Sequence, residues 1–186
     1  MRTDDVEAVL AVAGETLWHD GPSEGWWRRA RAEHLLATDP DGAWVATDGG
    51  DVVGVAMALV RERLWGLSLL AVSEHALGHG AGRGLVDHAV GTLDRAGTGI
   101  ILSSENPAAM RIYATSGFAL RPCVALAGDV RFRPERPAAV GEATAADHGW
   151  MDDVARAVRG GPYSGELPLW QARDAQLLCV AERGWL

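Results

Sequence analysis

The chain has 186 residues, of which 48% are apolar and 23% are charged, a composition typical of a soluble globular protein. Its formal net charge is −8, so it lacks the basic surface with which a nucleic-acid-binding protein displaces counterions from phosphates. All 17 cationic residues are arginine. The absence of lysine excludes a lysine Schiff-base enzyme and a P-loop nucleotide site, because both need that side chain.

The sequence predicts a cytoplasmic protein without a membrane partner. Its amino terminus is acidic rather than basic, unlike that of a signal peptide. The longest apolar run, residues 52–60, is much shorter than the roughly 20 residues that span a bilayer. Cys123 and Cys179 lie in apolar, strand-like runs and lack the spacing of metal ligands. We therefore expect both thiols to be buried and reduced.

Hydrophobic periodicity divides the first two thirds of the chain into helices and strands. The apolar residues of the first segments recur at helical spacing, and the period changes to that of strands at residue 43. In chain order the predicted elements are helices over 5–18 and 26–37, strands over 43–47, 52–60 and 64–72, a helix over 84–96, a strand over 100–103, a helix over 107–115 and a strand over 118–127. This order predicts an α/β fold with a mixed central sheet and helices on both faces.

A linker and a partial repeat of the first elements follow the last predicted strand. Residues 129–137 are polar, arginine-rich and interrupted by proline, which is typical of a linker. Residues 138–186 then repeat the order seen at the head of the chain, with an acidic helix start, a Gly-Pro break, a second helical stretch and a strand over 176–181. We predict a first domain over 1–128 and a C-terminal partial repeat over 138–186.

Three alternating glycines separate a predicted strand from a predicted helix. Gly78, Gly80 and Gly82 allow a tight turn that points backbone N–H groups at one spot, and the helix start adds a positive dipole end. The segment therefore suits an anion such as a pyrophosphate. Its spacing fails the dinucleotide fingerprint G-x-G-x-x-G/A from each glycine. A glycine-rich turn without a ligand is the alternative.

Two segments resemble the signatures of one enzyme family. The residues from Val72 to Gly82 resemble motif A of the GNAT acetyltransferases, V-x-P-x-x-[RQ]-G-x-G-x-[GA], with Glu74 in place of proline and Leu77 in place of arginine or glutamine. The residues from Asn106 to Phe118 match motif B, N-x-x-A-x-x-x-Y-x-x-x-G-F, at every fixed position. Residues 1–127 thus resemble a GNAT domain that lacks its opening strand, and 138–186 resemble the head of a second one without either motif.

The resemblance implies an acetyl-CoA-dependent N-acyltransferase that moves an acetyl group to a primary amine of a small molecule or peptide. It implies no metal. The cofactor-binding residues that it implies are Leu70, Ala71 and Val72 for the pantetheine, with Asn106 beside them, and Leu77, Gly78, His79, Gly80, Ala81, Gly82 and Arg83 for the pyrophosphate. The missing guanidinium at Leu77 predicts weakened binding, which Arg83 or His79 restores in part.

Tyr113 and Glu105 are the predicted catalytic residues. The resemblance implies that Tyr113 protonates the departing CoA thiolate, and a phenol still holds its proton at pH 7. Its alternative is a packed core tyrosine. Glu105 is the favoured general base, ahead of Glu62, Glu74, His75 and His79.

The resemblance implies that the first two helices and nearby strands select the acceptor. That region offers several polar and aromatic side chains, namely Glu15, Trp18, His19, Glu24, Trp26, Trp27 and His34. A buried helix face is the alternative for Trp26 and Trp27. The acceptor itself stays open, as do a homodimer and the question whether the chain is part of a longer protein. An acetyl-CoA-binding sensor or scaffold with weak or no turnover is the alternative function.

Overall fold

The computed structural model describes residues 1–17, 25–124, 129, 131–132, 135–172, 175–180 and 184–185. Trp18, His19 and Glu24, predicted near the acceptor, lie outside these residues. The chain divides into two compact units, Met1–Phe118 and Ala119–Leu186. Among the described residues, no helix is both long and apolar enough to cross a bilayer.

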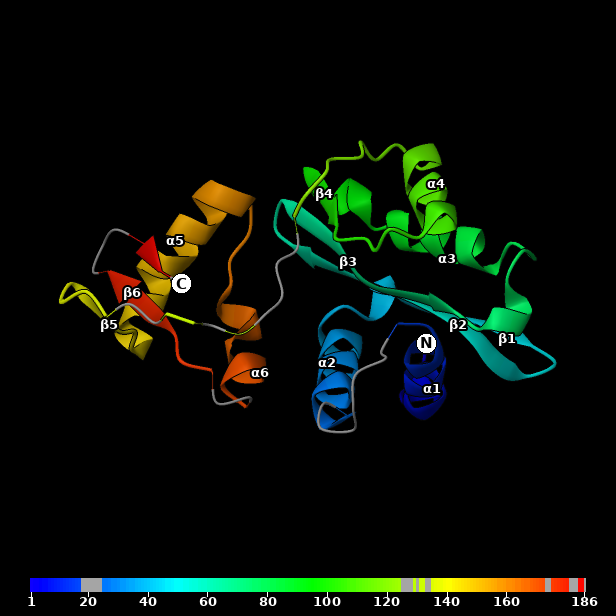
Figure 1. Cartoon of the computed structure of the whole chain (residues 1–186), viewed down its shortest axis with the longest axis horizontal. Coiled ribbons are helices and arrows are strands. Elements are labelled where there is room, and N and C mark those ends of the chain that lie inside the picture. The colour runs from blue at the N-terminus through cyan, green and yellow to red at the C-terminus, as the bar shows by residue number, and fades with distance from the viewer. Residues whose placement is uncertain are drawn as a thin grey trace. The chain divides into compact units, whose positions relative to one another are not determined.

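The first unit is built around a four-stranded mixed sheet (Figure 1). Its main elements are α1 (Val6–Leu17), α2 (Gly25–Thr38), β1 (Ala43–Asp48), β2 (Asp51–Arg61), β3 (Leu64–Val72), α3 (Ala81–Val90), β4 (Thr98–Ile101) and α4 (Pro107–Thr115). The strand order is β1-β2-β3-β4, with antiparallel pairing from β1 to β3 and parallel pairing between β3 and β4. The predicted mixed sheet is confirmed.

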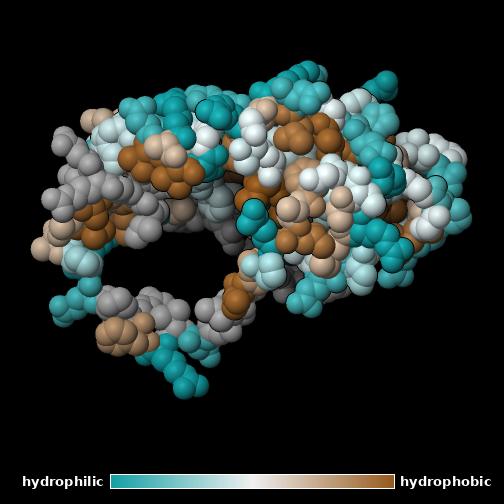
Figure 2. Space-filling view, turned by 90° about the horizontal axis from the view of Figure 1, so that it is seen from above, coloured by the Kyte–Doolittle hydropathy of each residue, from teal (hydrophilic) through white to brown (hydrophobic). Residues whose placement is uncertain are grey.

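Helices cover both faces of this sheet, as predicted. Figure 1 shows α1 and α2 on one side and α3 and α4 on the other. The two faces of β2 explain this arrangement, since Val55 and Met57 pack in the core under α1 and α2, whereas Ala56 and Ala58 pack with α3. Because β2 is buried on both faces, its sequence is an unbroken apolar run. Hydrophobic side chains also reach the surface, as the brown patches of Figure 2 show for one face.

Several predicted elements differ from the structure. The strand predicted over 100–103 is β4 at Thr98–Ile101, and the helix predicted over 84–96 is α3, which ends at Val90. Helix α3 begins at Ala81 rather than residue 84, because Gly80 takes a left-handed conformation (φ 89°) and serves as the N-cap. The strand predicted over 118–127 is wrong for residues 118–124, which form neither helix nor strand, and residues 125–127 lie outside the described residues. Pro122 lies in the middle of this segment and has no N–H to donate to a sheet. Cys123 is exposed there, contrary to expectation, whereas Cys179 is buried.

The second unit contains a small antiparallel sheet and two helices. Its elements are β5 (Val140–Glu142), α5 (His148–Arg159), α6 (Leu167–Gln171), β6 (Leu178–Val180) and β7 (Gly184–Trp185), and the strand order is β5-β6-β7. Met151, Ala155, Leu167 and Cys179 form its buried side chains among the described residues. Asp152 joins α5 to the following turn, because its carboxylate accepts the N–H groups of Tyr163 and Ser164 at 2.8 and 2.9 Å.

Candidate active site

The candidate site lies where two parallel strands part. β3 and β4 pair only from Leu64 opposite Thr98 to Leu67 opposite Ile101, but β3 continues to Val72. Residues 68–72 therefore present unpaired backbone groups toward the side where β4 has ended. A pocket of about 800 Å³ opens there. This free strand edge can pair with an extended, amide-containing ligand.

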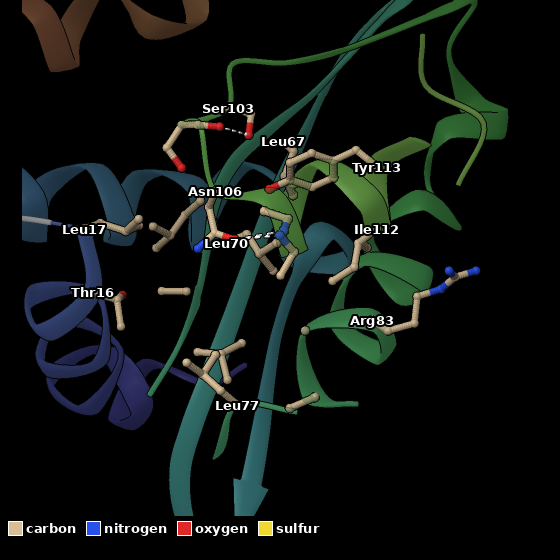
Figure 3. Close-up of a pocket in the computed structure, with 18 of the residues that line it drawn as sticks. Thr16, Leu17, Leu67, Leu70, Leu77, Arg83, Ser103, Asn106, Ile112 and Tyr113 are labelled. Atoms are coloured by element: carbon tan, nitrogen blue, oxygen red, sulfur yellow. Dashed lines mark hydrogen bonds between the residues drawn. The ribbon is translucent and has the colours of Figure 1, made fainter. Parts of the chain in front are cut away.

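The pocket draws its walls from both faces of the sheet. Figure 3 shows Thr16 and Leu17 of α1 on one side, and Ile112 and Tyr113 of α4 on the other. Of the predicted site residues, the pocket is lined by Leu70, Ala71, Val72, Leu77, Gly78, Gly80, Ala81, Gly82, Arg83, Asn106 and Tyr113. His79 and Glu105 are absent from that lining. Most of the predicted cofactor residues are thus brought together around one cavity.

The glycine loop forms one end of this pocket. Gly78 and Gly80 have positive φ angles of 80° and 89°, which residues with a side chain rarely adopt. Helix α3 starts directly after Gly80, so its first N–H groups have no intrahelical acceptor. Gly82 is less constrained, because an added Cβ would meet Val72 and Ile112 at ordinary contact distances of 3.5 and 3.6 Å. The loop has the geometry of an anion cradle, and Gly80 is its most demanding position.

Leu77 and Arg83 of the loop supply little positive charge to the pocket. Leu77 is 58% exposed and lines the pocket, where the family motif has arginine or glutamine. The Arg83 guanidinium instead donates to the carboxylate of Asp87 at 2.9 Å and to Oγ1 of Thr115 at 2.6 Å. Figure 3 shows Arg83 extending away from Leu70 and Asn106. Arg83 therefore ties α3 to α4, and the anion cradle depends mainly on backbone groups.

Asn106 shapes the wall opposite the strand edge. It is the N-cap of α4, and its Oδ1 accepts the N–H groups of Ala108 at 2.9 Å and Ala109 at 3.2 Å. Pro107 follows at the first helical position, where its missing N–H costs nothing. Because the oxygen of Asn106 is used in capping, its amide nitrogen remains as a donor to the pocket.

Tyr113 places a proton donor in the middle of the pocket. The residue is 6% exposed, and Figure 3 shows its hydroxyl pointing toward Asn106. Burial raises the pKa of Tyr113 above its ordinary value of 10.0, so the hydroxyl keeps its proton at neutral pH. None of the described residues makes a hydrogen bond to this hydroxyl, which leaves it available to a ligand.

The comparisons with known proteins agree with this geometry. A protein-family model described as the acetyltransferase (GNAT) family matches residues 13–118, more than half of the chain. The chain belongs to the GNAT acetyltransferase family. A search of curated protein sequences gave no significant match.

Solved structures share the GNAT fold. A protein from Pyrococcus horikoshii described as an acetyltransferase is 18% identical over 98% of this chain, with a TM-score of 0.71, and this chain spans 63% of its length. Ard1 from Thermoplasma volcanium is 22% identical over 66% of this chain and 81% of its own, with a TM-score of 0.55. AAC(6')-Iy, in complex with a bisubstrate analog of CoA, is 19% identical over 70% of this chain and 95% of its own, with a TM-score of 0.55.

The candidates for the general base of this GNAT domain differ in whether they line the pocket. Glu105 is exposed and lies outside the pocket lining, and the same lining omits Glu62, His75 and His79. Glu74 at the loop end and Glu15 at the end of α1 do line the pocket. Among the described residues, no cluster of histidine, cysteine or acidic side chains could hold a metal ion. Glu105 stays a prediction without support from the pocket.

The acceptor side of the GNAT pocket contains residues that the sequence analysis missed. Trp27 is buried and Trp26 is 51% exposed, so only one of the pair belongs to a buried helix face. Neither tryptophan lines the pocket, and neither does His34. Arg31 of α2 and Ser68 of β3 do. The signal for Arg31 was its place between Trp27 and Leu35 at a spacing of four residues, on the apolar stripe of α2.

Proposed function

We propose that this chain is an acetyl-CoA-dependent N-acetyltransferase that transfers the acetyl group to a primary amine of a small molecule or peptide. The observation that carries the proposal is the parting of β3 from β4 beside a glycine loop and a buried tyrosine. Family membership over residues 13–118 supports the same chemistry. Each part of the pocket has a role in this reaction.

Binding of acetyl-CoA would use mainly backbone groups. The free edge of β3 at Leu70, Ala71 and Val72 would pair with the amides of the pantetheine arm. The amide nitrogen of Asn106 would add a side-chain hydrogen bond. The N–H groups between Gly78 and Arg83 would hold the pyrophosphate, aided by the dipole of α3.

Acetyl transfer would proceed by direct attack of the amine on the thioester carbonyl. The nitrogen of the neutral amine forms a bond to the acetyl carbon, and collapse of the tetrahedral intermediate breaks the carbon–sulfur bond. The thiolate takes the proton of the Tyr113 hydroxyl, and the phenolate regains a proton from water. The nitrogen loses its extra proton to a carboxylate or to water. Glu15 lines the pocket on the side of α1, so we propose it, rather than the exposed Glu105, as that carboxylate.

A second candidate function rests on the weak charge of the cradle. Leu77 replaces the arginine or glutamine of the family motif, and the Arg83 guanidinium is engaged by Asp87 and Thr115, so neither residue supplies a free charge to the pyrophosphate. A domain of this kind could bind acetyl-CoA as a sensor or scaffold without turnover. The free hydroxyl of Tyr113 in the pocket favours the enzyme.

The test measures the rate at which the free thiol of CoA is released from acetyl-CoA with each of a panel of primary amines. If the chain is an enzyme, at least one amine should raise this rate above the rate of acetyl-CoA hydrolysis without an amine. Calorimetry with acetyl-CoA accompanies the assay. Binding without amine-dependent release would favour the sensor, and no binding would overturn both readings.

We also propose that residues 138–186 are a partial GNAT-like repeat without an acetyl-CoA site of its own. Its order β5-α5-α6-β6-β7 places two helices before a hairpin, as α1, α2, β1 and β2 do in the first unit. Few side chains are buried among its described residues, so we expect residues 138–186 expressed alone to show no cooperative unfolding. A sharp thermal transition of that segment would contradict this expectation.

A further inference from the structure

Arg31 is a charged side chain on the buried side of a helix. It lies on α2 four residues from Trp27 and four from Leu35, and both of these are buried. The arginine itself is partly buried and lines the pocket. An arginine at such a position has to satisfy its guanidinium inside the protein or with a ligand.

One nitrogen of Arg31 binds the strand at the point where the pocket opens. Its Nη2 donates to the backbone oxygen of Ser68 and, at 2.7 Å, to the Ser68 hydroxyl. Ser68 lies at a bulge in the pairing of β3 with β2, between Leu67 and Leu69. It directly follows Leu67, the last residue of β3 that pairs with β4. Arg31 therefore reaches the reaction end of the pocket and not its glycine-loop end.

The rest of the guanidinium has no partner among the described residues. Within the described part of the chain, neither Nη1 nor Nε makes a hydrogen bond, and no carboxylate forms an ion pair with Arg31. By contrast, Arg61 and Arg83 are paired with Asp39 and Asp87. Burial lowers the pKa of Arg31, which means that its charge lacks full compensation. A partly buried guanidinium without a counter-ion is stabilised by any anion that enters the pocket.

The other charged groups of the pocket do not replace that counter-ion. Its lining includes Glu15, Glu74, Arg83 and Arg111 besides Arg31. Glu15 is exposed at the end of α1 and makes no ion pair with Arg31 among the described contacts. Thr16, Leu17 and Leu69 are uncharged neighbours in the same lining. A carboxylate on the bound acceptor is thus the simplest partner for the free side of the guanidinium.

We propose that Arg31 binds a carboxylate of the acceptor, so that the preferred substrates are amines that also carry a carboxylate, such as amino acids. The inference rests on the proposed acetyl transfer and narrows its acceptor class. Polycationic amines are disfavoured, because the same guanidinium repels them. The hydrogen bonds of Arg31 to Ser68 hold the guanidinium beside the strand edge where the thioester is expected to lie.

The test compares matched acceptors that differ only in charge. Amino acids and their primary amides are offered to the full chain with acetyl-CoA, and kcat/KM is measured from thiol release. The parent should prefer the carboxylate by tenfold or more. Arg31→Gln should abolish the preference while it retains turnover of the amide, and Arg31→Lys should keep part of it. Arg29→Gln is the matched control, because Arg29 lies on the same helix, is paired with Glu7 and Glu33 and does not line the pocket.

Each outcome decides for or against the carboxylate. Equal use of acid and amide by the parent overturns the inference but leaves acetyl transfer intact. If Arg31→Gln loses turnover of the amino acid and of the amide equally, its preference for the carboxylate is unchanged. Arg31 then only supports Ser68, and this result also overturns the inference. If the parent turns over neither acceptor, acetyl transfer to such amines fails, and the binding of products tests the role of Arg31 instead. Calorimetry then measures the affinity of the protein with CoA for N-acetyl amino acids and for their amides. A tenfold tighter binding of the acid that is lost in Arg31→Gln supports the inference, and equal or absent binding of the two overturns it.

Discussion

The two ends of the pocket are built on different principles. At the glycine-loop end, backbone N–H groups and two left-handed glycines form the surface, and the Arg83 guanidinium is held by Asp87 and Thr115. At the reaction end, side chains from α1, α2, β3 and α4 converge, with Tyr113 and Arg31 among them. Backbone recognition needs glycines at fixed spacing, so it leaves a motif in the sequence. At the reaction end, Tyr113 belongs to a sequence motif, but Arg31 and Ser68, which come from distant elements, do not. This difference predicts that substitutions at the glycine loop alter the affinity for acetyl-CoA, whereas substitutions at the reaction end alter kcat.

The largest effect is expected from Tyr113→Phe. The ring and its packing remain, but the thiolate then leaves without its proton donor, so kcat should fall by about 10²–10⁴. Acetyl-CoA affinity should stay within a few-fold, because the cradle is elsewhere. Tyr163→Phe in the second unit is the control, since it removes the only other phenol of the chain. Steady-state kinetics under conditions where chemistry limits the rate, together with calorimetry, provide the measurement.

Two results would remove Tyr113 from the reaction. One is an unchanged kcat in Tyr113→Phe. The other concerns pH. Burial raises the pKa of Tyr113 above 10.0, so its proton is lost only at a higher pH than that of a free tyrosine. A loss of turnover caused by ionisation of Tyr113 must therefore lie above pH 10, and one centred below pH 9 has another source.

A smaller effect is expected from Gly80→Val. A β-branched residue at φ 89° strains the loop, although an added Cβ would meet no atom within 4 Å. Acetyl-CoA affinity should fall by tenfold or more, which is about 1.4 kcal/mol, and kcat at saturation should change little. Gly84→Ala is the matched control, since Gly84 lies in α3 with no positive φ, no close neighbour and no place in the pocket lining. Unchanged affinity in Gly80→Val, measured by calorimetry, would place the anion elsewhere.

The smallest effect is expected from Leu77→Arg. A guanidinium at this position restores the residue type of the family motif, and it should tighten acetyl-CoA binding by about fivefold, or ~1 kcal/mol. The gain is modest because Leu77 is 58% exposed, and solvent screens the new contact. Leu120→Arg adds the same charge at an exposed leucine outside the pocket and should leave affinity unchanged. Equal affinities of both variants would show that the backbone alone determines binding of the anion.

Sequence patterns predicted the cofactor half of the domain well, for physical reasons. β3 and α4 have the predicted bounds, because β3 is an uninterrupted apolar run and α4 is marked by Asn106, Pro107 and Gly117 at its ends. Helix α3 was placed three residues too late, since its first turn contains Gly82 and Gly84 and resembles a loop in sequence. The strand predicted over 118–127 failed at residues 118–124, because an apolar pattern does not ensure a pairing partner.

The acceptor half could not be predicted in the same way. Arg31 and Ser68 meet through a contact between residues 37 positions apart, and neither belongs to a motif. Glu105 was favoured for its place beside Asn106 in the chain, but it lies outside the pocket lining. Sequence proximity to a binding residue is therefore a poor guide here, whereas a charged residue on an apolar helical stripe is a usable one.

A crystal structure with bound acetyl-CoA is the most direct test of the central claim that β3 and β4 part to hold this substrate. We predict the pyrophosphate at the N–H groups of residues 78–83, the pantetheine along Leu70, Ala71 and Val72, and the thioester sulfur within hydrogen-bonding reach of the Tyr113 hydroxyl. Acetyl-CoA bound outside the gap between β3 and β4, or a sulfur beyond the reach of Tyr113, would contradict it.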